Sequence, residues 1–216
     1  VARHRADIAS VITETVERGF SDSLKPEPWQ TDTCIGDWHY NRARFTGHYY
    51  VPAHSVVQRL VDVVSKNGNL MLNIPQRGDG SIDSDERQIL TDIAAWMKVN
   101  GEAIFETRPW RNYGEGPTAV VAGMHGEGAA RPWTGQDIRF TTKGQTLYAF
   151  ALDWPEDRRM AIQALPLRAG RIEAVELLGG GPLPFSQTDQ GLTIDLPSQR
   201  PAVTAPAVRL RGAGLI

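Results

Sequence analysis

Carboxylates, aromatic rings and an imidazole are concentrated in one short segment, PWQTDTCIGDWHYNR, which runs from Pro28 to Arg42. This segment holds two tryptophans, a histidine, a tyrosine, two aspartates and the one cysteine of the chain. Carboxylates and imidazoles transfer protons, and flat aromatic faces hold ring-shaped ligands such as sugars. A strand that only fills a core has a plainer composition. The residue types therefore favour a binding or catalytic role for this segment.

The cysteine and the five histidines predict neither a disulfide nor a metal centre. Cys34 has no second cysteine to pair with, and we interpret it as a small buried side chain at the end of a strand. The histidines lack the spacing of metal ligands. The segment GDGSIDSDE resembles part of a calcium loop, but its oxygen ligands and glycine are wrongly spaced. We predict no metal and no cofactor.

The overall composition is that of an ordinary soluble globular protein. Of the 216 residues, 41% are hydrophobic and 22% are charged, with a net charge of −2. The small negative charge argues against nucleic acid or an anionic membrane as the partner. There is no apolar run long enough to span a membrane, and no signal peptide is visible at Val1. The composition does not indicate a cellular compartment.

Residues 1–106, the first half, alternate between helical and strand patterns. In HSVVQRLVDVVSKNG, four apolar side chains recur at helical spacing, and Asn67-Gly68 supplies a left-handed stop. The next segment, NLMLNIP, reads as a strand buried on both faces. Asp83 and Glu86 then predict a capping box that starts a second helix. This order of strand and helix is typical of a parallel α/β sheet.

Residues 107–216, the second half, follow a different pattern. RPWRNYGEGP is interpreted as a loop or linker, because of its proline and glycines. Short alternating segments follow it, and DIRFTT and TLYAFALD are joined by KGQ, which predicts a tight hairpin. There is no convincing helical pattern. The second half therefore predicts an antiparallel β-sandwich.

Four phrases together resemble the C-terminal portion of the α-L-fucosidases of glycoside hydrolase family 29. They are PWQTDTCIGDWHYN, LVDVVSKNGNLMLNIPQRGDGSIDSDE, WMKVNGEAIFETRPW and DIRFTTKGQTLYAFALDWP. The resemblance runs from about Thr15 to the C-terminus. It implies that residues 1–106 are the C-terminal segment of a catalytic (β/α)8-like barrel and that residues 107–216 are a C-terminal β-sandwich domain. It also implies a retaining exo-glycosidase that removes terminal α-L-fucose from an oligosaccharide or glycoconjugate.

The resemblance also suggests which residues form the site. The acid/base glutamate of the family often lies in a Thr-x-Glu phrase before the tryptophan-containing strand, and Glu17 fits that phrase here, with Glu14 and Glu27 as alternatives. Trp38 matches the aromatic residue that lies against the sugar. The neighbours of Trp38 with weaker claims are His39, Tyr40 and Asp37. Arg5 matches an arginine that contacts the sugar, a position that Arg3 fits equally well.

The family's nucleophilic aspartate and its sugar-binding histidines belong to strands upstream of Val1. The resemblance therefore implies a C-terminal fragment without the nucleophile. Because an incomplete barrel leaves strand edges and apolar faces open, we expect the missing barrel strands or an oligomeric partner to cover them. The alternative function is a non-catalytic module, which either binds carbohydrate or completes another chain's barrel. The tryptophans considered for carbohydrate binding are Trp110, Trp133 and Trp154.

Overall fold

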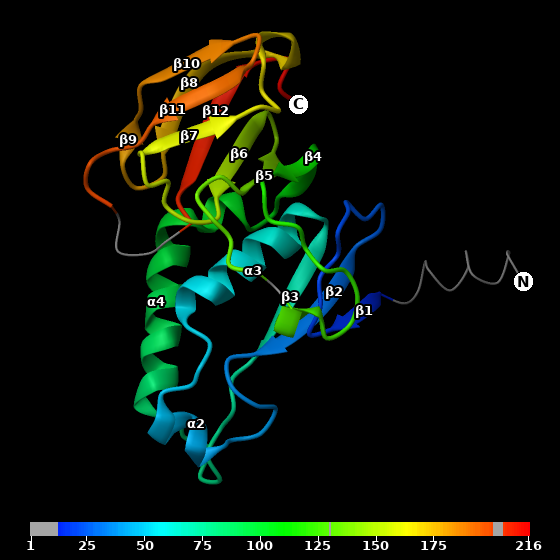
Figure 1. Ribbon diagram of the computed structural model, residues 1–216, viewed down its shortest axis with the longest axis vertical. Coiled ribbons are helices and arrows are strands. Elements are labelled where there is room, and N and C mark those ends of the chain that lie inside the picture. The colour runs from blue at the N-terminus through cyan, green and yellow to red at the C-terminus, as the bar shows by residue number, and fades with distance from the viewer. Residues whose placement is uncertain (1–12, 130, 201–204) are drawn as a thin grey trace, which may run out of the picture.

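The first half of the chain forms a parallel sheet with helices on one side. A computed structural model describes residues 13–129, 131–200 and 205–216. The strands are β1 (Glu14–Glu17), β2 (Trp29–Cys34) and β3 (Gly68–Asn73), in the order β1-β2-β3. The helices are α2 (Arg42–Gly47), α3 (Ala53–Ser65) and α4 (Ser84–Asn100), followed by the 3-10 turn η1 (Gly101–Ala103). Figure 1 shows α3 between the sheet and α4. The predicted alternation and the parallel pairing are confirmed.

Helix α3 packs on the sheet through Val63, whereas Val57 and Val61 of its apolar stripe belong to a separate buried cluster with Trp96 of α4. Val63 of α3 packs with Val16 and Trp29 in one buried cluster, and Leu70 packs against that cluster. Asn67 has a φ of 69°, so the chain leaves the helix through the left-handed conformation that its sequence predicts. Strand β3 then starts at the next residue.

Helix α4 begins with the predicted capping box. Asp83 Oδ1 accepts hydrogen bonds from the backbone N–H groups of Asp85 and Glu86, at 3.1 and 2.9 Å. In return, Glu86 Oε2 accepts the backbone N–H of Asp83 at 3.0 Å. Glu86 is fully buried, and its second oxygen, Oε1, has no hydrogen-bond partner among the described residues. Burial raises the pKa of this carboxyl, because the charged form loses its hydration.

The raised pKa of Glu86 predicts a pH-dependent loss of stability that Glu86→Gln should remove. Above the pKa of an unfolded glutamate, the folded state retains a proton that the unfolded state has lost. The free energy of unfolding therefore falls as the pH rises through the raised pKa. Glutamine keeps an acceptor for the capping box. Urea unfolding between about pH 4 and pH 7 should show the variant gaining stability relative to the wild type as the pH rises. A constant difference across this range would contradict the prediction.

Strand β3 differs from its prediction, because only one of its faces is covered. Met71 is 51% exposed and Asn69 is also exposed, whereas Leu70 packs beneath α3. The prediction of a strand buried on both faces is wrong for the described structure. Apolar side chains in NLMLNIP have a helix layer on one side only, and the described residues supply no layer for the other side.

The second half forms two antiparallel sheets around one apolar core, as predicted. The larger sheet has the order β4-β5-β6-β12-β8-β9 and the smaller one β10-β11-β7. The strands of the larger sheet are β4 (Arg108–Glu115), β5 (Ile138–Lys143), β6 (Thr146–Ala151), β8 (Arg171–Leu177), β9 (Gly181–Pro182) and β12 (Ala207–Ala213). Those of the smaller sheet are β7 (Arg159–Ile162), β10 (Phe185–Thr188) and β11 (Gly191–Asp195). Both sheets contribute buried side chains to one core, for example Phe140, Val208 and Ile194. The described helical segments of this half are the 3-10 turns η2 (Gly126–Ala129) and η3 (Leu167–Ala169).

The turn chemistry of the second half is partly as predicted. Strands β5 and β6 form the predicted hairpin, and Gly144 has a φ of 57° in its turn. The prediction of a loop or linker for RPWRNYGEGP is wrong for residues 108–115, which form strand β4. Pairing with β5 overrides the proline and glycine signals, at the expense of a shift in register between Pro109 and Gly114.

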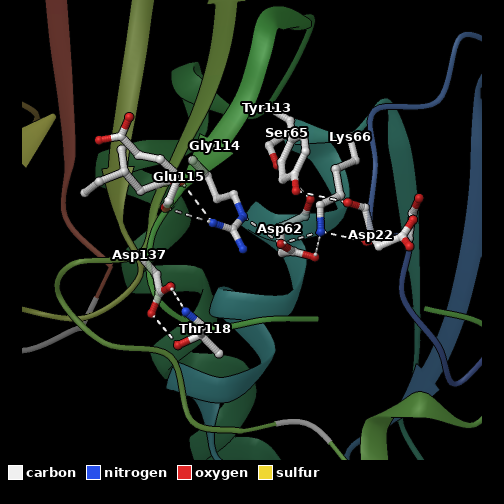
Figure 2. A network of polar contacts seen from close by, with 12 residues as sticks. Asp22, Asp62, Ser65, Lys66, Tyr113, Gly114, Glu115, Thr118 and Asp137 are labelled. Carbon is white, nitrogen blue, oxygen red and sulfur yellow. Dashed lines mark hydrogen bonds and ion pairs between the residues drawn. The ribbon is translucent and has the colours of Figure 1, made fainter. Parts of the chain in front are cut away.

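Several buried contacts join the two halves. The Trp96 ring of α4 stacks on Phe150 of β6, with 6.4 Å between ring centroids. Nearby, a fully buried ion cluster connects α3 to β5 (Figure 2). In this cluster the Asp62 carboxylate binds Lys66 Nζ at 2.8 Å and Arg139 Nε at 2.7 Å. No helix of the described chain is long and apolar enough to cross a membrane.

Candidate active site

Glu17 and Trp38 follow neighbouring parallel strands and therefore lie at the same edge of the sheet. Glu17 is the last residue of β1, and the 35–41 loop, which holds Trp38, follows β2. In the parallel register Glu17 pairs with Asp32, so the carboxyl ends of both strands point the same way (Figure 1). The carboxyl edge of a parallel sheet is where α/β proteins collect their functional side chains.

The Glu17 side chain projects from the face that α3 does not cover. Val16 is buried with Trp29 beneath α3, and successive side chains of a strand alternate between faces. Glu17 is half-buried, and its register partner Asp32 is on the same face. Asp32 Oδ1 accepts the backbone N–H of Arg18 at 3.2 Å. Two carboxylates thus stand on adjacent strands at the open side of this edge.

The two competing glutamates lie at the opposite edge. Glu14 is the first residue of β1, and its exposed carboxylate pairs with Lys25 at 3.2 Å. Glu27 is exposed and precedes the start of β2. Of the three candidates, Glu17 alone shares the carboxyl edge with the Trp38 loop.

Polar contacts fix the Trp38 loop from two sides. Arg44 Nη2 and Asn41 Nδ2 each donate to the Asp37 carboxylate at 2.8 Å. The hydrogen bond from Arg44 holds the pKa of Asp37 below its usual value, so Asp37 is a carboxylate that orders the loop rather than a proton donor. From the end of β3, Asn73 Nδ2 donates to the backbone carbonyl of Trp38 at 3.3 Å.

The loop leaves the predicted sugar contacts accessible. Trp38 is 39% exposed and His39 is also exposed, so both side chains can meet a ligand. Tyr40 is half-buried, and its hydroxyl accepts a hydrogen bond from Arg77 Nε at 3.4 Å. An exposed indole beside a carboxylate edge suits a ring with one apolar face.

The remaining residues considered from the sequence are the arginines near the N-terminus, Cys34 and the groups that could bind a metal. Arg5 and its alternative Arg3 lie outside the described residues. Cys34 is buried at the end of β2, as predicted, and burial raises the pKa of its thiol. Within residues 13–129, 131–200 and 205–216, no group of acidic, histidine or cysteine side chains is arranged to hold a metal ion.

Sequence reasoning assigned no role to Asp32 or Arg18, although both flank Glu17. Their proximity depends on the register in which Glu17 of β1 faces Asp32 of β2. One sequence signal could have suggested that Glu17 and Asp32 share an edge of the sheet, because each falls near the end of a short strand. The eleven-residue connection from 18 to 28 gives no signal that fixes the register.

Comparison with known proteins agrees with the resemblance read from the sequence. A family model described as α-L-fucosidase matches residues 2–102, and one described as the α-L-fucosidase C-terminal domain matches residues 132–211. The rat plasma α-L-fucosidase is 32% identical over 180 residues, and the human tissue α-L-fucosidase is 31% identical over 187 residues. The chain belongs to the α-L-fucosidase family.

The fucosidase relatives are longer than this chain. The matched regions cover 81% of this chain and 35% of the rat protein, and 86% of this chain and 36% of the human protein. The chain therefore spans about a third of the curated α-L-fucosidases that it matches.

Solved fucosidase structures share the fold. One α-L-fucosidase superposes with a TM-score of 0.71 at 27% identity, over 91% of this chain and 42% of that one. A Thermotoga maritima α-fucosidase in complex with fucose gives a TM-score of 0.67 at 27% identity, over 88% of this chain and 41% of that one.

Proposed function

We propose that this chain is the C-terminal part of a retaining α-L-fucosidase that acts on terminal fucose of an oligosaccharide or glycoconjugate. Residues 1–106 are the last units of a (β/α)8-like catalytic barrel, and residues 107–216 are its β-sandwich domain. The observation that carries the proposal is the shared carboxyl edge, where Glu17 and the Trp38 loop end neighbouring parallel strands in a chain of this family.

In this proposal Glu17 is the general acid/base. A retaining glycosidase uses two carboxyl groups about 5–5.5 Å apart, one as nucleophile and one as proton donor. Glu17 protonates the leaving oxygen in the first step, and in the second it accepts a proton from the attacking water. Trp38 packs against the apolar side of fucose, and His39 and Arg5 bind its hydroxyl groups. The nucleophile comes from the barrel strands that precede this chain, and the reaction needs no cofactor.

The open face of the parallel sheet supports the need for further barrel strands. β1 and β3 are the edge strands of the described sheet, and Met71 stands exposed on its uncovered face. Closure of a barrel satisfies strand edges and buries inward-facing side chains. We therefore propose that the partner of this face is the remaining part of the barrel, in the same protein or in an associated chain.

The non-catalytic alternative has less support in its carbohydrate-binding form. Trp110, Trp133 and Trp154 are 3%, 8% and 8% exposed, so these rings offer no face to a sugar. In its barrel-completing form, the same chain closes the barrel but Glu17 transfers no proton. Substitution of Glu17 separates this form from the proposed enzyme.

The isolated chain is expected to show no measurable hydrolysis of an aryl α-L-fucoside, because it lacks the proposed nucleophile. The complete enzyme, meaning this chain together with the preceding barrel strands, is expected to hydrolyse the same substrate. Initial rates at matched concentration test both expectations. Robust turnover by the chain alone would contradict the assignment of the nucleophile to another part of the protein, and an inactive complete enzyme would contradict the proposed function.

A further inference from the structure

A segment of the second half reaches back to the end of β1, and its start is firmly anchored. This clamp segment comprises residues 118–127 and lies between the ranges that the two family models match. At its start, the buried Asp137 carboxylate accepts Thr118 N at 2.9 Å and Thr118 Oγ1 at 2.8 Å (Figure 2). The same carboxylate accepts the backbone N–H of Thr134 at 2.8 Å. Asp137 thus binds the chain at Thr118, where the clamp segment starts, and again at Thr134, after the clamp segment has ended.

The clamp segment binds the backbone that surrounds Glu17. His125 N donates to the Glu17 carbonyl at 2.8 Å, and Glu127 N donates to the Arg18 carbonyl at 3.2 Å. The clamp segment approaches the backbone of Gly19 so closely that a Cβ atom there would lie 2.0 Å from the carbonyl oxygen of Gly123. The contacts therefore leave no room for a side chain at residue 19.

Arg18 follows Glu17 in a conformation that needs this support. Its φ is 46°, in the left-handed region that a residue with a side chain adopts only at a free-energy cost of roughly 1–2 kcal/mol. The Arg18 N–H is bound to the carbonyl oxygen of Asp32 at 2.9 Å. Its side-chain Nε donates to Glu127 Oε2 at 3.4 Å. A strained residue of this kind persists only where several contacts fix it, and it is typical of functional sites.

The Glu127 carboxylate connects three elements at this point. Its side chain is 7% exposed, and its second oxygen, Oε1, lies 3.3 Å from Arg59 Nη1 of α3. Arg59 Nη1 also donates to Thr33 Oγ1 of β2 at 3.1 Å. One buried carboxylate therefore ties the turn after Glu17 to the helix and to the neighbouring strand.

We propose that Glu127 is a positioning residue for the acid/base, which holds Arg18 in its left-handed conformation and so fixes the backbone of Glu17 at the carboxyl edge. The inference rests on the proposed function of Glu17. Without the Glu127 carboxylate, Arg18 relaxes towards an ordinary conformation and the Glu17 carboxyl moves relative to the leaving oxygen. A displacement of this kind lowers the rate of proton transfer more than it weakens sugar binding, because the sugar contacts belong to other residues.

The first test measures the clamp in the 216-residue chain itself. Glu127→Ala is expected to speed hydrogen exchange of the backbone amides at positions 125 and 127 by roughly tenfold, because their environment loses a charge-assisted contact. The Leu152 amide, which is bound to the Asp137 carbonyl at 2.8 Å, serves as the internal reference and should not change. Glu106→Gln removes an exposed ion pair with Lys143 and is the matched control. Equal acceleration of all three amides, or none, would overturn the proposal.

The second test measures kinetics in the complete enzyme. Glu127→Ala is expected to lower kcat by about 10- to 100-fold with little change in KM. Glu127→Gln, which keeps an acceptor for Arg18, should lose less. If Glu127 acts through Arg18, the effect must shrink when residue 18 tolerates the left-handed region by itself. In an Arg18→Asn background, Glu127→Ala should therefore change kcat by less than about threefold.

The outcomes separate this inference from the function on which it rests. An unchanged kcat in Glu127→Ala, a rise in KM alone, or an equal loss in the Arg18→Asn background would overturn the positioning role. In parallel, Glu17→Gln is measured in the same enzyme. If Glu17→Gln has no effect on kcat, the acid/base assignment fails and the positioning role falls with it, whatever the amide exchange shows.

Discussion

Replacement of Asp62 by asparagine is expected to lower the free energy of unfolding by about 3–5 kcal/mol. Among the described residues, Asp62 is the one carboxylate that directly contacts both Lys66 Nζ and Arg139 Nε, and all three side chains are buried. Asparagine keeps the shape of the side chain but leaves two buried cations without an anion beside them. Because the cluster joins α3 to β5, its loss also loosens the junction between the two halves of the chain.

Urea unfolding, with two comparison variants, tests this expectation. Asp195→Asn breaks an exposed ion pair with Arg159 and should cost less than about 1 kcal/mol. Lys66→Met removes one buried cation, whose pKa burial already lowers, and leaves Asp62 paired with Arg139. It should therefore cost less than Asp62→Asn. A larger loss in Lys66→Met than in Asp62→Asn would show that the cluster does not depend on its carboxylate.

Glu17→Ala in the complete enzyme is expected to reduce kcat/KM by about 10²–10⁴-fold for fucosides with poorly acidic leaving groups. General acid catalysis matters most when the leaving oxygen is basic, because that oxygen must be protonated as the bond breaks. For a fucoside of a strongly acidic phenol, the reduction in kcat/KM should be much smaller. Steady-state rates across a series of leaving groups measure this dependence.

The other two glutamates provide controls for the Glu17 prediction. Glu14→Gln and Glu27→Gln change carboxylates at the amino edge of the sheet, so neither should alter the dependence on the leaving group. If Glu17→Ala lowers kcat/KM equally for all substrates, Glu17 supports the fold rather than transferring a proton. If Glu14→Gln or Glu27→Gln shows the leaving-group dependence instead, the acid/base assignment moves to that residue.

Much of the fold could be predicted, because local chemistry and tertiary structure agree in those elements. The apolar stripe of α3 ends at Asn67 in the left-handed conformation, as its sequence indicates. The capping box of Asp83 and Glu86 starts α4. In the second half, Gly144 marks the hairpin turn between β5 and β6. Each of these signals is satisfied by contacts within a few residues, so no knowledge of distant partners was needed.

The errors arose where a distant partner, or the lack of one, decides the outcome. β4 contains Pro109 and Gly114, which favour a loop, yet pairing with β5 makes it a strand. β3 is apolar enough to be buried on both faces, but Met71 is exposed because the described chain has no layer opposite α3. The buried contact between Asp62 and Arg139 spans 77 positions and has no local signature.

For the candidate site, the sequence offers residue types but not their geometry. The aromatic segment at the end of β2 marked Trp38 as a ligand contact, and the structure leaves this ring 39% exposed. The neighbouring roles of Asp32 and Glu127 depend on strand register and on a return of the chain from the second half. Those contacts join segments whose sequences carry no matching pattern.

The configuration of the product formed with azide tests the central claim most directly. In the Glu17→Ala variant of the complete enzyme, a fucoside with a strongly acidic leaving group can still form the fucosyl-enzyme. Azide can then displace the nucleophilic carboxylate from the sugar without a general base. Two displacements in sequence give α-L-fucosyl azide, with faster turnover as azide is added, and NMR identifies the anomer. We predict this retained product. A β-L-fucosyl azide would identify Glu17 as the nucleophile, and turnover that does not respond to azide would deny it either catalytic role.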